Sequence, residues 1–165
     1  GAFFFTGSVA IRRSLLDSLQ PCFPEGESLG EDQDLWFRLS EKSSMVFCCS
    51  QLVGYRIDVE GSLCATNEVL HLLPVYERLE QRALKHQLPV RLRQSALSLV
   101  AENRITVART SIRRSRRFEA GTQLFRAWRG ITSKRWWVTL AMCFFASPSM
   151  TEQWERWRIA RSQVK

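Results

Sequence analysis

Residues 29–39 read LGEDQDLWFRL, and this stretch gives the clearest indication of local structure in the chain. A loop ends at Gly30, and three carboxylates follow within four positions, on Glu31, Asp32 and Asp34. The first turn of a helix has unpaired backbone N–H groups and the positive end of the helix dipole, so it stabilises anionic side chains. We therefore expect an amphipathic helix that begins near Gly30, with the carboxylates in its first turn.

The same three carboxylates have two readings. Ser28 and Glu31 have the Ser-x-x-Glu spacing of a capping box, so the cluster can simply begin a stable surface helix. Neighbouring carboxylates can also bind a metal, orient hydroxyl groups or take up a proton. The stretch alone leaves both readings open, and the residues around it decide between them.

Charge divides the chain into two regions. Residues 1–67 carry five basic and nine acidic side chains, and residues 68–165 carry nineteen basic and seven acidic ones. The net charges are therefore −4 and +12, within a chain of 165 residues that is 45% hydrophobic. Such asymmetry indicates two regions with different roles in a globular protein. The basic region suits phosphate, on nucleic acid, an anionic membrane or a phosphorylated lipid.

The cysteines indicate reduced thiols and a cytoplasmic setting. No Cys-x-x-Cys pair occurs, and the two histidines, His71 and His86, lie far in sequence from most of the cysteines. This spacing disfavours both structural zinc and a disulfide framework. No signal peptide is evident, and the abrupt apolar start at Gly1 suggests a fragment of a longer protein.

Hydrophobic periodicity predicts two strands followed by helices. Residues 3–11 and 45–55 have the β-prone composition of strands, whereas residues 15–19 suit a short helix. From residue 68 onward the apolar spacing becomes helical. The expected helices there cover residues 89–115, 118–128 and 134–146.

Three motifs in order carry a resemblance to a known family. They are FTGSVAIRR at residues 5–13, GEDQDLW at residues 30–36, and Tyr55-Arg56 before a polar loop. Their order and spacing resemble the acceptor-side half of the GT-A domain of family 2 glycosyltransferases. The resemblance implies an α/β fold, in which residues 1–67 form part of a mixed, Rossmann-related sheet. Residues 68–165 would follow as a helical, basic, Trp-rich region, and the donor-binding half would lie upstream of Gly1.

The resemblance also implies a reaction and roles for particular residues. The enzyme would transfer a sugar, with inversion, from a nucleotide-sugar donor to a saccharide or lipid-linked acceptor. By its place in the motif, Asp32 would be the base that takes the proton of the acceptor hydroxyl; a carboxylate is ionised and available at neutral pH. Glu31, Asp34 and Gly7 would contact the acceptor. Alone, this fragment would be expected to be inactive.

Arg56 and Asp58 are expected near the diphosphate of the donor. Family members commonly have histidine where this sequence has Asp58. An aspartate there can bind Mg²⁺ or Mn²⁺, or it can form an Asx-turn. The main ligands of the divalent metal would lie upstream of this chain.

The tryptophans of the basic region leave two alternatives open. Residues 136–146 are uncharged but number only eleven, whereas a membrane-spanning helix needs about 20. Tryptophans interleaved with arginines can pack helices together or rest on a membrane surface, here the inner face of the membrane. The alternative to an enzyme is a non-catalytic basic module, which would bind an anionic membrane surface, or nucleic acid through residues 91–135. The arginines are spread over several helical faces, so nucleic acid is the less favoured partner.

Overall fold

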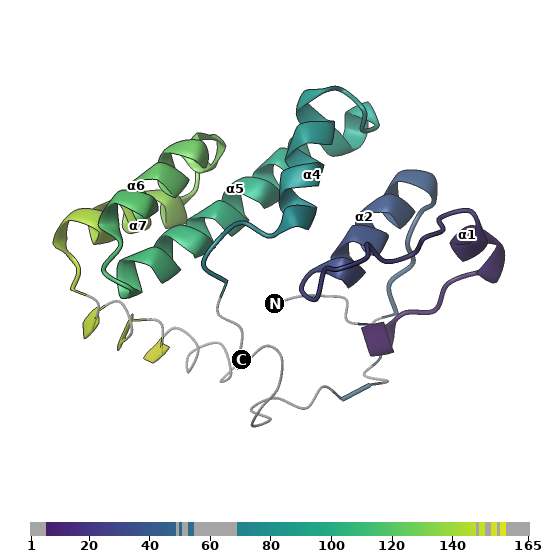
Figure 1. Ribbon diagram of the computed structural model, residues 1–165, viewed down its shortest axis with the longest axis horizontal. Helices are drawn as coiled ribbons and strands as arrows, with labels where there is room; N and C mark the ends of the chain where they lie inside the picture. Colours follow the sequence, from purple (N-terminus) through teal and green to yellow (C-terminus); the bar gives the residue numbers. More distant parts are fainter. Residues whose placement is uncertain are drawn as a thin grey trace. The chain divides into compact units, whose positions relative to one another are not determined.

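The computed structural model describes residues 6–48, 50, 53–54, 69–147, 149–150, 153–154 and 156–157 (Figure 1). The chain divides into two compact units. Unit 1 comprises Gly1–Asn67 with Leu73–Val75, and unit 2 comprises Glu68–Leu72 with Tyr76–Lys165. Each unit is described by itself below.

Unit 1 is built around one amphipathic helix. A 3₁₀ turn, η1 (Thr6–Ser8), and a short helix, α1 (Arg13–Asp17), precede helix α2 (Glu31–Lys42). Helix α2 buries Leu35, Trp36 and Leu39 on one face, because residues four positions apart share a helical face. Several apolar residues from the preceding segments pack on that face: Val9, Ile11, Leu15, Leu16, Leu19 and Cys22.

The start of α2 depends on a glycine rather than on a capping side chain. Gly30 is the N-cap residue, and no side chain caps the helix there, so the predicted Ser28 and Glu31 capping box does not form. The φ angle of Gly30 is 83°, in the left-handed region, where the backbone of a residue with a side chain is strained. A Cβ on Gly30 would also lie 3.0 Å from Cγ1 of Val75. Glycine therefore allows both the turn and the close approach.

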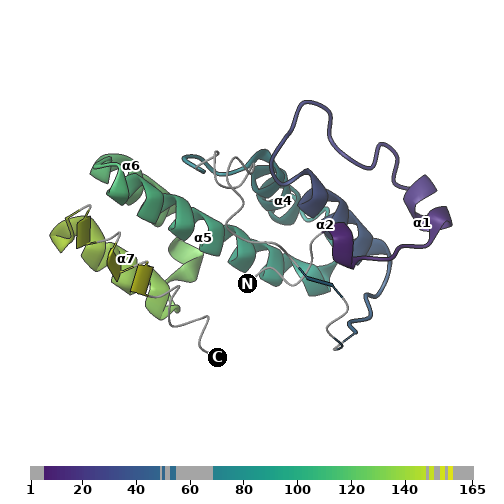
Figure 2. The same ribbon diagram turned by 90° about the horizontal axis from the view of Figure 1, so that it is seen from below.

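Unit 2 is a helical bundle that is centred on its longest helix. After α4 (Pro74–Leu84), whose first two residues belong to unit 1, the chain forms α5 (Val90–Arg113), α6 (Arg117–Arg126), the 3₁₀ turn η2 (Trp128–Gly130) and α7 (Lys134–Phe145). Helix α5 contacts α6, η2 and α7, and these elements lie side by side in both views (Figures 1 and 2). Their shared core contains, among others, Ile105, Ile112, Leu124 and Met142.

Two arginines of unit 2 are buried rather than exposed on its surface. Arg109 is 2% exposed, and its Nε donates to Oγ1 of Thr139 over 2.8 Å, while its guanidinium lies 4.6 Å from the ring centre of Trp154. Arg104 is 6% exposed and pairs with Glu80 at 2.5 Å. Buried charges need such partners, so part of the positive charge of this region stabilises the fold.

The predicted α/β fold is wrong. The described residues are helical with no strand, so the predicted mixed sheet is not found. Within residues 3–11, Thr6–Ser8 form η1, and Val9 and Ile11 pack against α2 instead of pairing with a strand. Within residues 45–55, Val46 is 95% exposed, which is incompatible with a place in a buried sheet. Residues 3–5, 49, 51–52 and 55 lie outside the described part.

The predicted helices after residue 68 agree with the structure to within a few residues. α5, α6 and α7 begin at residues 90, 117 and 134, close to the predicted starts at 89, 118 and 134. Ser133 caps α7 by accepting a hydrogen bond from the backbone N–H of Trp136 over 3.2 Å. Helical periodicity is a strong signal here because each helix has one face against the shared core.

Candidate functional site

The first turn of α2 brings Asp32 next to η1. One carboxylate oxygen of Asp32, Oδ2, accepts a hydrogen bond from the hydroxyl of Thr6 over 3.4 Å. The other oxygen, Oδ1, accepts from the backbone N–H of Gln33 over 2.7 Å. Two of the three motifs identified in the sequence therefore meet at one carboxylate, although 26 positions separate Thr6 from Asp32.

Asp34 faces a different set of partners. Its Oδ2 accepts from Nε of Arg38 over 2.9 Å, one turn later on α2. The same guanidinium donates to the backbone carbonyls of Leu19, at 2.8 Å, Pro21, at 3.2 Å, and Cys22. Asp34 therefore orients an arginine that holds the loop between α1 and α2. This role supports the loop, and the predicted acceptor contact of Asp34 stays a prediction.

Glu31 keeps one oxygen without a hydrogen-bond partner in the described part of the chain. Its Oε2 is shielded from water, while the residue as a whole is half-buried. A shielded carboxylate oxygen without a donor is unfavourable. Glu31 therefore keeps an acceptor oxygen that none of the described residues uses.

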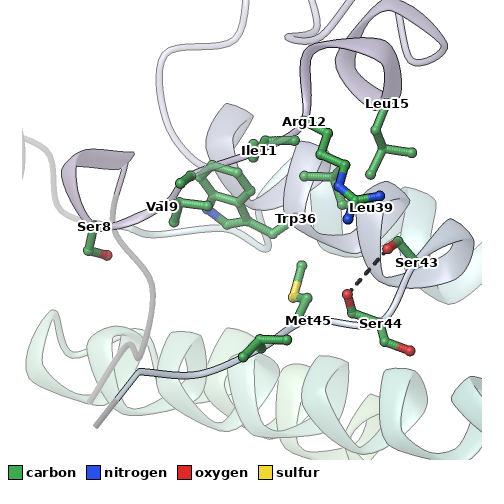
Figure 3. Close-up of a pocket in the computed structure, with 12 residues that line it drawn as sticks. Ser8, Val9, Ile11, Arg12, Leu15, Trp36, Leu39, Ser43, Ser44 and Met45 are labelled. Atoms are coloured by element: carbon green, nitrogen blue, oxygen red, sulfur yellow. Dashed lines mark hydrogen bonds between the residues drawn. The ribbon is translucent and has the colours of Figure 1, made fainter. Parts of the chain in front are cut away.

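A pocket of about 420 Å³ lies in unit 1 (Figure 3). Volumes of this size are typical of small-molecule sites. Trp36 and Leu39 reach it from α2, and the segments after η1 and after α2 supply the rest of the wall. Polar and apolar atoms have similar shares of the exposed wall. Its lining combines apolar side chains with one arginine and three serines: Ser8, Val9, Ala10, Ile11, Arg12, Leu15, Trp36, Leu39, Ser43, Ser44, Met45 and Val46.

Asp32 lies on the same stripe of α2 as the wall of the pocket. Trp36 and Leu39 follow Asp32 at the i+4 and i+7 positions, which share one helical face. Trp36 is 8% exposed, and its indole Nε1 has no hydrogen-bond partner within the described residues. In Figure 3 this nitrogen lies on the side of the ring nearest Val9. Asp32, whose carboxylate accepts from Thr6, and Trp36, whose indole N–H has no partner in the described part of the chain, are therefore one helical turn apart on α2.

Gly7 is the remaining predicted site residue within the described part. It is an exposed residue of the 3₁₀ turn η1 rather than of a strand, and its predicted contact with the acceptor stays a prediction. Arg56 and Asp58 lie outside the described residues, so their expected positions near a diphosphate and a metal stay predictions. No group of three or more potential ligands suited to a metal occurs among the described His, Cys, Asp and Glu side chains.

Sequence reasoning missed Thr6 and the pocket. Thr6 belongs to the first motif, but its position opposite Asp32 depends on how the chain between residues 9 and 30 turns back. Two residues of the pocket wall, Trp36 and Leu39, can be identified from the sequence, because they follow Asp32 at the i+4 and i+7 positions of one apolar stripe. Arg12, which also lines the pocket, belongs to the first motif, but its place in the wall could not be read from the motif.

Comparison with known proteins identifies no relative. No family model matches the chain, and neither the curated proteins nor the solved structures contain a significant match. The helices that the structure describes are all too short or too polar to cross a bilayer.

Proposed function

We propose that unit 1 is the acceptor-side part of an inverting glycosyltransferase and that Asp32 is its base. The observation that carries this proposal is the meeting of Thr6 and Asp32 at the start of the helical stripe whose Trp36 and Leu39 line a pocket of ligand size. The motif resemblance supplies the type of reaction, and the shared stripe supports it because Asp32 lies one helical turn before Trp36 of the pocket wall.

The reaction requires one proton transfer and one exchange of bonds. As the acceptor oxygen attacks the anomeric carbon, Asp32 takes the hydroxyl proton. The new glycosidic bond forms while the bond to the nucleotide diphosphate breaks on the opposite face, and the diphosphate leaves with the bonding electron pair. Positioning of the acceptor hydroxyl against this carboxylate supplies much of the rate.

The neighbouring carboxylates have separate roles in this proposal. Glu31 orients the acceptor through its unpartnered Oε2. Asp34 acts indirectly, by holding Arg38 and the loop that this arginine fixes. The pocket wall contains Trp36 and Leu39 as well as one arginine and three serines, so it suits an acceptor with both an apolar and a polar portion, such as a lipid-linked saccharide.

The donor side lies outside this arrangement. A nucleotide sugar and a divalent metal, Mg²⁺ or Mn²⁺, would be bound mainly by residues upstream of Gly1, with Arg56 and Asp58 near the diphosphate. The cysteine pattern and the nucleotide-sugar donor together favour a cytoplasmic protein.

The decisive experiment compares Asp32→Asn with Asp34→Asn in the complete natural gene product. We expect Asp32→Asn to lower sugar transfer by at least ~100-fold while donor binding persists, because only the proton acceptor is lost. Asp34→Asn should mainly lower the thermal stability. Unchanged transfer by Asp32→Asn would contradict the proposed role of Asp32.

The alternative is a non-catalytic basic module that binds nucleic acid through residues 91–135. Arg104 and Arg109 belong to that segment, and both are buried in pairs within unit 2. A phosphate backbone needs exposed cations. This burial weighs against nucleic acid as the partner, and the exposed aromatic residues of the same unit suit a different surface.

A further inference from the structure

Helix α7 is apolar on both of its faces, but only one of them is covered. Its inner face packs into the core of unit 2 through Thr139 and Met142, and Trp136, Leu140 and Cys143 are partly buried beside them. The outer face is exposed at Trp137 (55%), Val138 (40%), Phe144 (68%) and Phe145 (84%), with the exposed Ala141 between them. These positions follow the i, i+1, i+4, i+7, i+8 spacing of a single helical face.

Two tryptophans that are adjacent in sequence, Trp136 and Trp137, have different surroundings in the structure. The indole N–H of Trp136 donates to the backbone carbonyl of Leu124 over 3.1 Å, which ties this residue to α6. The indole N–H of Trp137 donates to the carbonyl of Ile131 over 2.9 Å, yet its ring stays more than half exposed. The two rings meet edge to face, with 5.0 Å between their centres. Trp136 is therefore a packing residue, whereas Trp137 is held rigidly at the surface.

Cations lie beside this outer face. Lys134 precedes Trp137 by three positions and so belongs to the same stripe of α7. Arg126 ends α6, a helix that contacts α7. Lys134 and Arg126 are both exposed, and within the described ranges neither has an ion-pair partner. Between Arg135 and the end of α7 there is no charged residue.

We propose that the outer face of α7 docks on an anionic lipid bilayer, with the helix lying parallel to the surface. Phe144, Phe145 and Trp137 enter the boundary between head groups and acyl chains, where aromatic side chains are favoured. Lys134 and Arg126 meet the lipid phosphates. A helix of twelve residues cannot span the bilayer but can lie in its interface. This proposal is independent of sugar transfer.

The arrangement favours a bilayer over the two other partners that an exposed basic and aromatic surface can have. Nucleic acid requires cations along the contact, whereas this face is uncharged between its ends. A soluble protein partner would not account for the net charge of +12 on residues 68–165, which matches the negative surface potential of an anionic membrane.

The test is sedimentation of the 165-residue chain with vesicles of phosphatidylcholine, with and without phosphatidylglycerol. We expect binding to the anionic vesicles only, falling as salt is raised. Phe144→Gln with Phe145→Gln should weaken binding by at least ~10-fold, since buried aromatic area is lost. Lys134→Gln should weaken it by about fivefold. Val90→Gln, at a 76% exposed position of α5, is the matched control and should not change binding.

The variants change exposed side chains, so their helix content by circular dichroism should match that of the parent chain. Absence of vesicle binding by the parent chain would overturn the proposal, and so would binding that the two Phe substitutions leave unchanged. Loss of self-association in these variants, without vesicle binding by the parent, would identify the face as a protein interface instead. Binding of a duplex RNA that the Phe substitutions weaken, without vesicle binding, would equally reject the membrane.

Discussion

Asp34 and Arg38 form an ion pair one helical turn apart, with 2.9 Å between Oδ2 and Nε. The carboxylate orients the guanidinium, which donates to three backbone carbonyls of the preceding loop, those of Leu19, Pro21 and Cys22. Asp34 and Arg38 thus form a clamp on the loop before α2. Asp32, which faces Thr6, is the carboxylate to which the proposed proton transfer is assigned.

We predict that Arg38→Ala lowers the free energy of unfolding by about 2 kcal/mol, because charged hydrogen bonds to three carbonyls are lost. Arg38→Lys should recover only part of this, since an ammonium cannot reproduce the planar guanidinium. Urea denaturation of the chain measures both. Arg13→Ala, at an exposed position, is the control, and an equal loss for both alanine variants would contradict the clamp.

Gly30→Ala is expected to destabilise unit 1 more than Gly26→Ala. Both glycines have positive φ, 83° and 76°, so either substitution costs roughly 1 kcal/mol or more in backbone strain. Only at Gly30 does the new Cβ meet Val75, at 3.0 Å, whereas nothing lies within 4 Å at Gly26. Thermal unfolding of the two variants gives the comparison. Equal melting temperatures would mean that the contact relaxes without cost.

Thr139→Val should cost about 1–3 kcal/mol, because Nε of the buried Arg109 loses its acceptor. The substitution keeps the shape of a side chain that is 0% exposed. Thr122→Val is the matched control: the exposed Thr122 hydroxyl also bonds the carbonyl four residues earlier, at 3.0 Å, but has no buried donor. Chemical denaturation should show a change within ~0.5 kcal/mol for the control. A similarly small change for Thr139→Val would contradict the role assigned to its hydroxyl.

Cys48 should be alkylated at lower pH than Cys143. Hydrogen bonds from the backbone and the side chain of Ser50 lower the pKa of Cys48, whereas burial raises the pKa of Cys143. The thiolate is the reactive form, so a lowered pKa moves the rise in rate to lower pH and a raised pKa moves it to higher pH. Mass spectrometry of peptides after brief iodoacetamide treatment at several pH values measures both rates. Faster alkylation of Cys143 at neutral pH would contradict the order.

The helices could be predicted from the sequence because their periodicity reflects a single packed face. α2 begins where Gly30 and the carboxylates indicate, and α5 to α7 follow their apolar spacing. The strands could not be predicted correctly, because a run such as residues 3–11 is equally suited to cover a helix with Val9 and Ile11. Local composition does not distinguish an apolar segment that pairs with a strand from one that packs on a helical face.

Only the clustering of the three carboxylates in the candidate site could be predicted from the sequence. The sequence indicates that Glu31, Asp32 and Asp34 share the first turn of α2, but not which neighbour each of them meets. Arg38 is visible as the i+4 partner of Asp34, so that ion pair could have been read from spacing. The approach of Thr6 to Asp32 depends on the path of the intervening loop, which no local pattern encodes.

The C-terminus of α7 has a consequence for how that helix meets a surface. Arg117 donates to the carbonyls of Cys143, Phe144 and Ala146, at 2.8–3.0 Å, and so satisfies the end of the helix within the protein itself. Interfacial helices that are unfolded in water lose conformational entropy as they fold on lipid. α7 is already formed and held in place, so the affinity of its outer face for lipid is not reduced by a folding step, and its helix content should stay constant on binding.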